Sequence, residues 1–192
     1  MFSVCVVACA VLVTAGAWDV PCSSVTPVND IPMSQFRGQW MAMETYNDER
    51  MRNVVPSLCL RMDLNSVNAT RLNSESTATE MSIGFKTYKK ALFDLDNPSQ
   101  KGQWAARLVN GDGDVTEEHE NLWLLAADPS LYFTQVWCFR DPETSILQVK
   151  DLITWRRINQ TLSEQNIVDL RNAVKSSLKT SDLEALNFNS SC

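Results

Sequence analysis

The sequence predicts an all-β fold, an eight-stranded antiparallel up-and-down β-barrel with one C-terminal α-helix packed outside it. Short runs rich in Val, Leu, Ile, Thr and aromatic residues recur along most of the chain, separated by turn clusters. One amphipathic helical segment follows the last run and needs a sheet on which to bury its apolar stripe. A closed barrel meets both conditions and also removes exposed sheet edges.

The predicted strands follow a Pro-containing segment at residues 22–36. The eight strand-like runs cover residues 39–46, 58–65, 78–86, 89–95, 103–109, 122–127, 132–139 and 147–157. Clusters of turn-forming residues separate the later runs at 96–99, 110–113, 128–130 and 141–144. The polar segment 65–77 has no clear pattern, and both a loop and an edge strand remain open for it.

The helix is predicted to begin at a capping box, Thr161-Leu162-Ser163-Glu164. Four apolar residues then recur at helical spacing and form one stripe: Ile167, Leu170, Val174 and Leu178. Three charged residues occupy the side that we expect to face solvent: Asp169, Arg171 and Lys175.

The first residues indicate secretion. An apolar run at residues 4–13 is too short to span a bilayer and is followed by Ala15-Gly16-Ala17, a small-x-small site of the kind that signal peptidase cuts. We therefore expect a signal peptide at 1–17 and a single extracellular domain at 18–192. No later stretch approaches membrane length, so we expect no integral membrane span.

The cysteines and asparagines agree with this compartment. Four cysteines follow the predicted signal peptide, and their even number predicts two disulfides with three possible connectivities: Cys22, Cys59, Cys138 and Cys192. Three N-x-S/T tripeptides are candidate glycosylation sites: Asn68, Asn159 and Asn189.

The charge balance argues against nucleic acid as a partner. The chain has 192 residues, 17 Lys+Arg against 23 Asp+Glu, and a net charge of −6. Binding to a phosphate backbone needs clustered basic residues, which this balance does not supply. The sequence does not indicate an oligomeric state.

Three segments resemble the conserved motifs of the lipocalin family. Gly38-Gln39-Trp40 follows an aromatic and a basic residue and opens an alternating strand, like the lipocalin Gly-x-Trp motif. Residues 122–128 resemble the second motif, where Thr-Asp-Tyr is usual; Asp128 is kept, but its neighbours differ. Residues 153–162 resemble the third motif, which carries an Arg on the last barrel strand.

This resemblance implies a structural closure of the barrel base. In lipocalins the Arg of the third motif lies over the Trp of the first, which assigns the closure here to Gly38, Trp40 and Arg157. Trp155 and Arg157 share a strand face by the period of two, which favours Arg157. Arg156 is the alternative if the register differs by one residue.

The cysteine pattern resembles one lipocalin branch, that of apolipoprotein D and the insect bilin-binding proteins. This resemblance implies the pairs Cys22–Cys138 and Cys59–Cys192. It also implies a secreted carrier of a small hydrophobic ligand, such as a fatty acid, sterol, retinoid, or bilin or carotenoid pigment. No cofactor and no metal are expected.

Aromatic residues on the strands are the candidate ligand contacts, because the inward positions of a small barrel can line a cavity for one ligand. Trp155 is the first candidate, since it shares a face with Arg157. Tyr132, Phe93 and Tyr88 are further candidates.

Catalysis is not expected. His119 is the only histidine, and it lies in an acidic cluster that we interpret as solvated. Pairing of all four cysteines would leave no thiol of the kind that prostaglandin-isomerising lipocalins use. The alternatives are a secreted interaction or defence protein with a vestigial pocket and a lipid isomerase. An open pocket would favour the carrier, a barrel filled with side chains the interaction protein, and a free thiol in a cavity the isomerase.

Overall fold

The computed structural model describes residues 20–46 except 29, 55–110 except 96 and 98, 114–179 and 184–188. Over these residues the strands are β1 (Gly38–Tyr46), β2 (Leu58–Asn68), β3 (Arg71–Glu80), β4 (Phe85–Asp94), β5 (Gln103–Val109), β6 (Val115–Asp128), β7 (Tyr132–Arg140), β8 (Leu147–Arg157) and β9 (Ala185–Asn187). The helix is α1 (Glu164–Leu178), and short 3₁₀ turns occupy η1 (Cys22–Ser24), η2 (Met33–Phe36) and η3 (Val55–Ser57). The predicted signal peptide lies outside the described residues.

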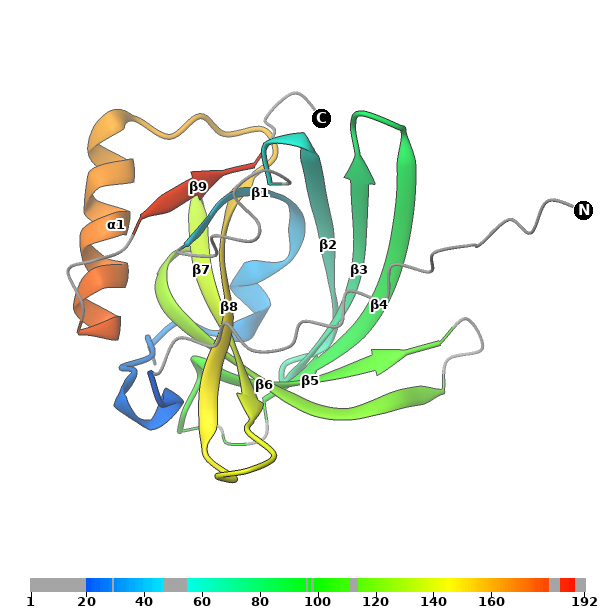
Figure 1. The fold of residues 1–192 in the computed structure, drawn as a ribbon, viewed down its shortest axis with the longest axis vertical. Coiled ribbons are helices and arrows are strands. Elements are labelled where there is room, and N and C mark those ends of the chain that lie inside the picture. Colours follow the sequence, from blue (N-terminus) through cyan, green and yellow to red (C-terminus); the bar gives the residue numbers. More distant parts are fainter. Residues whose placement is uncertain are drawn as a thin grey trace, which may run out of the picture.

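The strands close into a barrel (Figure 1). They pair antiparallel in the order β2-β3-β4-β5-β6-β7-β8-β1, and β1 also pairs with β2. The short strand β9 pairs with the end of β1, on the edge of β1 opposite to β8. The predicted eight-stranded barrel with one C-terminal helix outside it is therefore confirmed, whereas β9 was not predicted.

The structure corrects the prediction for residues 65–86. The polar segment 65–77 forms the end of β2 and most of β3. The run 78–86, predicted as one strand, contains the end of β3, a turn at 81–84 and the start of β4. Gly84 has a φ of +67°, a conformation that glycine adopts without a steric penalty and that suits this tight turn. Sequence patterning left most of β3 undecided because Ser and Thr, and not large apolar residues, occupy many of its alternating positions.

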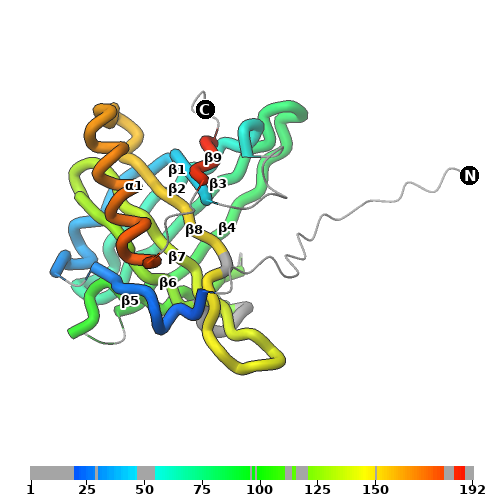
Figure 2. Tube along the Cα trace, turned by 60° about the vertical axis from the view of Figure 1, so that its left-hand side comes forward, coloured from blue at the N-terminus to red at the C-terminus, as the bar shows by residue number. Residues whose placement is uncertain are grey.

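Helix α1 packs against the outside of the barrel, mainly on β6 (Figure 2). Its buried stripe contains Leu170, Val174 and Leu178, as predicted. The cap is shifted from the predicted one: Ser163 is the N-cap residue, and its side chain and that of Asn166 satisfy each other's backbone N–H groups. The capping partner of Ser163 is thus Asn166, the third residue of the helix, and not Glu164.

Arg171 faces solvent only in part, with 40% of its side chain exposed. Its guanidinium forms an ion pair with Glu44 on β1, whose carboxylate is buried. A β-bulge between Ala42 and Glu44 shifts the register of β1 against β8, and Glu44 consequently points outward beneath α1. The hydroxyl of Tyr46 donates a hydrogen bond to Glu44 Oε2 at 3.1 Å. Burial, followed by the negative charge of Glu44, raises the pKa of Tyr46 well above its usual value.

The disulfide Cys22–Cys138 is confirmed, with a Cα–Cα distance of 6.2 Å. It ties the segment before β1 to β7. Cys59 is also disulfide-bonded. Its expected partner, Cys192, lies outside the described residues, so that pairing stays a prediction.

In the part of the chain described by the structure, no helix has the length and apolar character needed to cross a membrane.

Candidate ligand-binding site

The base of the barrel is closed by Trp40 and Arg157. Trp40 is fully buried, and its Nε1 donates to the carbonyl oxygen of Phe36 at 2.8 Å. The guanidinium carbon of Arg157 lies 3.9 Å from the centroid of the Trp40 ring. Arg157 also donates hydrogen bonds to the carbonyl oxygens of Gln35 and Pro129. Arg156 instead donates to the carbonyl oxygen of Gln160, so Arg157 is the residue over Trp40.

Gly38 fits this closure for two reasons. Its φ is +111°, which residues with a Cβ rarely adopt. A Cβ at this position would also lie 2.6 Å from Nη1 of Arg157. A side chain here would therefore strain the backbone and displace the guanidinium.

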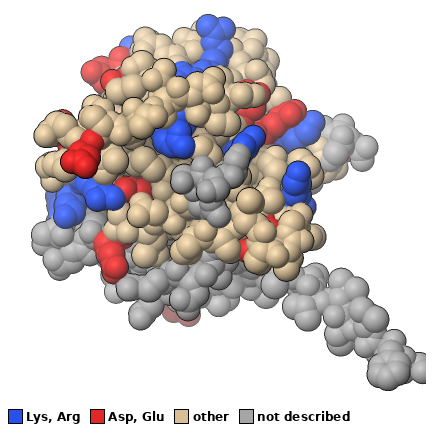
Figure 3. All heavy atoms as spheres, turned by 90° about the horizontal axis from the view of Figure 1, so that it is seen from above, with Lys and Arg blue, Asp and Glu red and all other residues tan. Residues whose placement is uncertain are grey.

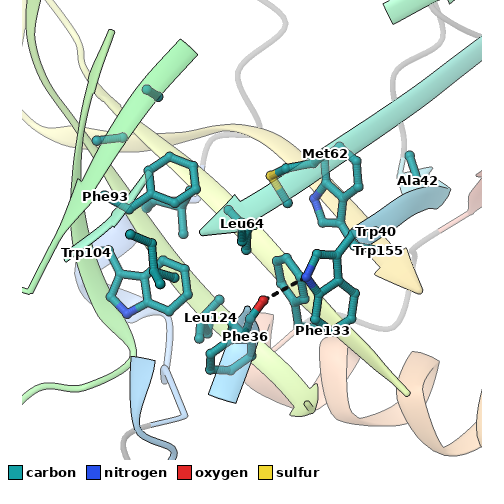
Figure 4. Close-up of a cluster of buried hydrophobic side chains, with 14 of the residues drawn as sticks. Phe36, Trp40, Ala42, Met62, Leu64, Phe93, Trp104, Leu124, Phe133 and Trp155 are labelled. Carbon is teal, nitrogen blue, oxygen red and sulfur yellow. Dashed lines mark hydrogen bonds between the residues drawn. The ribbon is translucent and has the colours of Figure 1, made fainter. Parts of the chain in front are cut away.

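A layer of aromatic rings packs above the closure (Figure 4). Phe133 meets Trp40 edge to face at a centroid distance of 4.6 Å, and Phe36 meets both Phe133 and Trp104 in the same way. Trp155 stacks on Phe133 with a centroid distance of 6.5 Å. These rings fill the base of the barrel, and Trp155 lies where this packed layer meets open space.

That open space is a cavity of about 500 Å³. Its described walls come from β2, β3, β4, β5, β7 and β8. The larger apolar side chains lining it are Leu60, Met62, Phe93, Leu108, Trp137, Ile153 and Trp155. This volume lies within the range of roughly 300–1,000 Å³ typical of small-molecule sites.

Gln135 places one polar group in the aromatic part of the wall. It is buried, and its Oε1 faces the indole N–H groups of Trp137 and Trp155, at 2.9 and 3.2 Å, in the amide orientation that satisfies both. One amide oxygen therefore holds two tryptophan rings in place, since each indole has only one N–H to donate. No pattern in the sequence predicted this role for Gln135.

A second part of the wall is polar. Ser74, Ser76, Thr77 and Thr87 line it together with three charged residues, Arg61, Lys89 and Asp151. Serine and threonine hydroxyls can donate or accept hydrogen bonds. The cavity thus combines an aromatic region with a polar one, which suits a ligand with an apolar body and at least one polar group.

The structure separates the four predicted ligand contacts. Trp155 and Phe93 line the cavity. Tyr132 packs in the cluster between the barrel and α1, and Tyr88 is exposed, so neither is among the described lining residues. Strand alternation explains this, because Tyr132 precedes the inward Phe133, and Tyr88 is an odd number of residues from the inward Phe93. Trp137 was missed, although its spacing from Gln135 and Phe133 places all three on one face.

Two candidate glycosylation sites are accessible. Asn68 and Asn159 are both exposed, at the end of β2 and just after β8. Asn189 lies outside the described residues. Modification at all three positions remains a prediction.

Among the described residues, no group of three or more His, Cys, Asp or Glu side chains is placed to hold a metal ion.

No protein-family model matches the chain, and no curated protein matches it by sequence. Solved structures do match. Insecticyanin from the tobacco hornworm Manduca sexta is 18% identical, with a TM-score of 0.64 over 86% of this chain and 85% of that one. The amine-binding protein of Rhodnius prolixus, solved as a tryptamine complex, is 17% identical, with a TM-score of 0.61 over 88% and 86%.

Lobster apocrustacyanin A1 is 15% identical, with a TM-score of 0.61 over 90% of this chain and 92% of that one. These structures match nearly the full length of both chains although few residues are shared. Together with the closed eight-stranded barrel and its outer helix, they show that the chain has the lipocalin fold.

Proposed function

We propose that the protein is a secreted, non-catalytic carrier that binds one small hydrophobic ligand in the barrel. The observation that supports this most strongly is the open cavity of about 500 Å³ above a tightly packed base. A protein that used only its loops for recognition would not need this space. Burial of ligand surface against the apolar wall would supply most of the affinity, at about 25 cal/mol per Å².

The described cysteines favour binding over isomerisation. Cys22 and Cys138 are paired with each other, and Cys59 is disulfide-bonded, so none of the three offers a thiolate for nucleophilic attack. None of them lines the cavity. A role as a lipid isomerase therefore has no support from these residues.

The ligand class follows from the two parts of the wall. The aromatic part, with Trp137, Trp155 and Phe93, suits a ring system or an acyl chain, and the polar part suits a head group. We propose a fatty acid, sterol, retinoid, or bilin or carotenoid pigment. The amine-binding protein of Rhodnius prolixus, solved with tryptamine, illustrates a small organic ligand bound by a protein of this fold.

The Cys22–Cys138 bond also supports placing the chain near apolipoprotein D and the insect bilin-binding proteins, the branch whose pairing it matches. Within this proposal, Cys59 pairs with Cys192. Non-reducing peptide mapping that found Cys192 free, or paired with another residue, would remove this assignment.

Titration of tryptophan fluorescence tests the site. We expect a saturable change at one ligand per protein for at least one of these classes. Trp155→Ala should then weaken binding about tenfold, the worth of one large aromatic contact. Trp123→Ala is the matched control, because Trp123 packs in the outer cluster and should leave the Kd unchanged. Equal weakening by both variants would show that ligand does not contact Trp155.

A further inference from the structure

The hairpin of β3 and β4 ends in exposed apolar side chains. Met81, Ile83, Phe85 and Tyr88, here called the apolar tip, are 41%, 76%, 63% and 71% exposed. They account for four of the eight large hydrophobic side chains that are exposed among the described residues. Isolated exposed apolar residues are ordinary, but a cluster within eight positions indicates an interaction surface.

The apolar tip is held by an ordered hairpin. β3 and β4 pair without interruption from Glu80 and Phe85 at the turn to Arg71 and Asp94 at the far end. Glu80, the acidic residue next to the turn, accepts hydrogen bonds from the side chains of Ser57 and Ser82. In Figure 1 the hairpin rises at the upper right, on the side of the barrel away from α1.

Lysines flank the apolar tip on β4. Lys86, Lys89 and Lys90 are all exposed, although the whole chain carries a net charge of −6. Nζ of Lys90 lies 3.1 Å from Oε1 of Glu75 and forms an ion pair with it. Neither Lys86 nor Lys89 forms an ion pair with another described residue. Figure 3, which views the molecule from this end, shows several separate basic side chains set in uncharged surface, with some acidic ones among them.

The two faces of the hairpin both carry apolar and basic groups. Strand alternation places Phe85 on the same face as Lys89, and Tyr88 on the opposite face with Lys86 and Lys90. A rigid protein partner could readily cover one face of this hairpin. A lipid interface surrounds an inserted hairpin on both faces, with apolar side chains at the acyl boundary and ammonium groups at the phosphates.

We propose that the apolar tip inserts into the interface of membranes that contain anionic phospholipids. The same hairpin supplies Ala78, Thr87 and Lys89 to the cavity wall, so docking would bring this wall close to the lipid. The docking itself does not depend on the carrier function, because Ile83, Phe85 and Lys86 do not line the cavity.

Cosedimentation with vesicles tests the proposal. The full secreted chain should bind vesicles of phosphatidylcholine mixed with phosphatidylserine, bind phosphatidylcholine alone more weakly, and be released by salt. The double variant Ile83→Ser, Phe85→Ser should bind at least about tenfold more weakly, because the inserted apolar surface is lost. Lys86→Glu should reduce binding about fivefold or more.

Val168→Ser is the matched control, since Val168 is an exposed apolar residue on α1, away from the hairpin. It should bind vesicles like the unaltered chain, and the circular dichroism of all variants should be unchanged. Absence of binding to the anionic vesicles, or equal weakening by Val168→Ser, would overturn the proposal. So would a dimer in solution that the double variant converts to a monomer, because a second copy of the chain would then cover the tip.

Discussion

Gln135 illustrates, at the scale of single residues, how one buried polar group can organise an apolar cavity. Without a partner, the indole N–H groups of Trp137 and Trp155 would each lose a hydrogen bond on burial, at a cost of about 1–3 kcal/mol. The amide oxygen of Gln135 faces both of them at hydrogen-bond distance. Their planes, and with them the shape of the aromatic wall, are therefore fixed before a ligand arrives.

Arg157 is the residue whose loss should most clearly destabilise the barrel base. Arg157→Ala removes the cation over Trp40 and leaves the carbonyl oxygens of Gln35 and Pro129 without their donor. We expect the free energy of unfolding to fall by about 1–3 kcal/mol, with ligand affinity little changed because Arg157 does not line the cavity.

Arg156→Ala is the matched control for Arg157→Ala in thermal or urea denaturation. Arg156 lies beside Arg157 on β8. Within the described part of the chain, its guanidinium donates hydrogen bonds only to the backbone carbonyl oxygens of Arg157 and Gln160. Its loss should change the free energy of unfolding by no more than about 0.5 kcal/mol. An equal loss of unfolding free energy in the two variants would show that the stacking of Arg157 on Trp40 does not contribute measurably to stability.

At the scale of elements, one ion pair joins α1 to the barrel. Glu44 on β1 is almost completely buried beneath the helix, and Arg171 and Tyr46 are its partners. The sequence pattern placed Arg171 on the solvent side because helical periodicity reports only the helix, and not the β-bulge that turns a carboxylate toward it.

Arg171→Met should therefore destabilise the protein by about 3 kcal/mol, because it leaves a buried carboxylate without its counter-ion. The double variant Glu44→Gln, Arg171→Met should recover much of that loss, since no buried charge remains. Urea denaturation of these two variants and of Glu44→Gln alone measures the difference. If the double variant lost as much as the sum of the separate substitutions, the two side chains would not be coupled.

The elements differ in how far the sequence predicted them. Strands with alternating large apolar residues, such as β1, β7 and β8, and the apolar stripe of α1 were found close to their observed bounds. Most of β3 was left undecided between a loop and an edge strand, because its inward positions include Ser74 and Ser76, which line a cavity and not a packed core. The same polar wall that gives the cavity its chemistry thus removed the pattern that identifies a strand.

At the scale of the whole molecule, the barrel is divided into a rigid end and an open one. The closed end contains the predicted Gly38, Trp40 and Arg157, together with the aromatic layer above them. Of the candidate site, the sequence identified Trp155 and Phe93 but not Trp137, Gln135 or the polar wall. Choosing among the aromatics needed the strand register, which alternation alone does not supply.

The central claim is that this cavity holds one small hydrophobic ligand, and native mass spectrometry of the purified protein tests it most directly. The protein is equilibrated with a fatty acid, a sterol, a retinoid and a bilin, and its intact mass is compared before and after. We predict a single added mass per chain for at least one class, reduced in Trp155→Ala. A correctly disulfide-bonded protein that retained no ligand from its host and bound none of the four would contradict the claim.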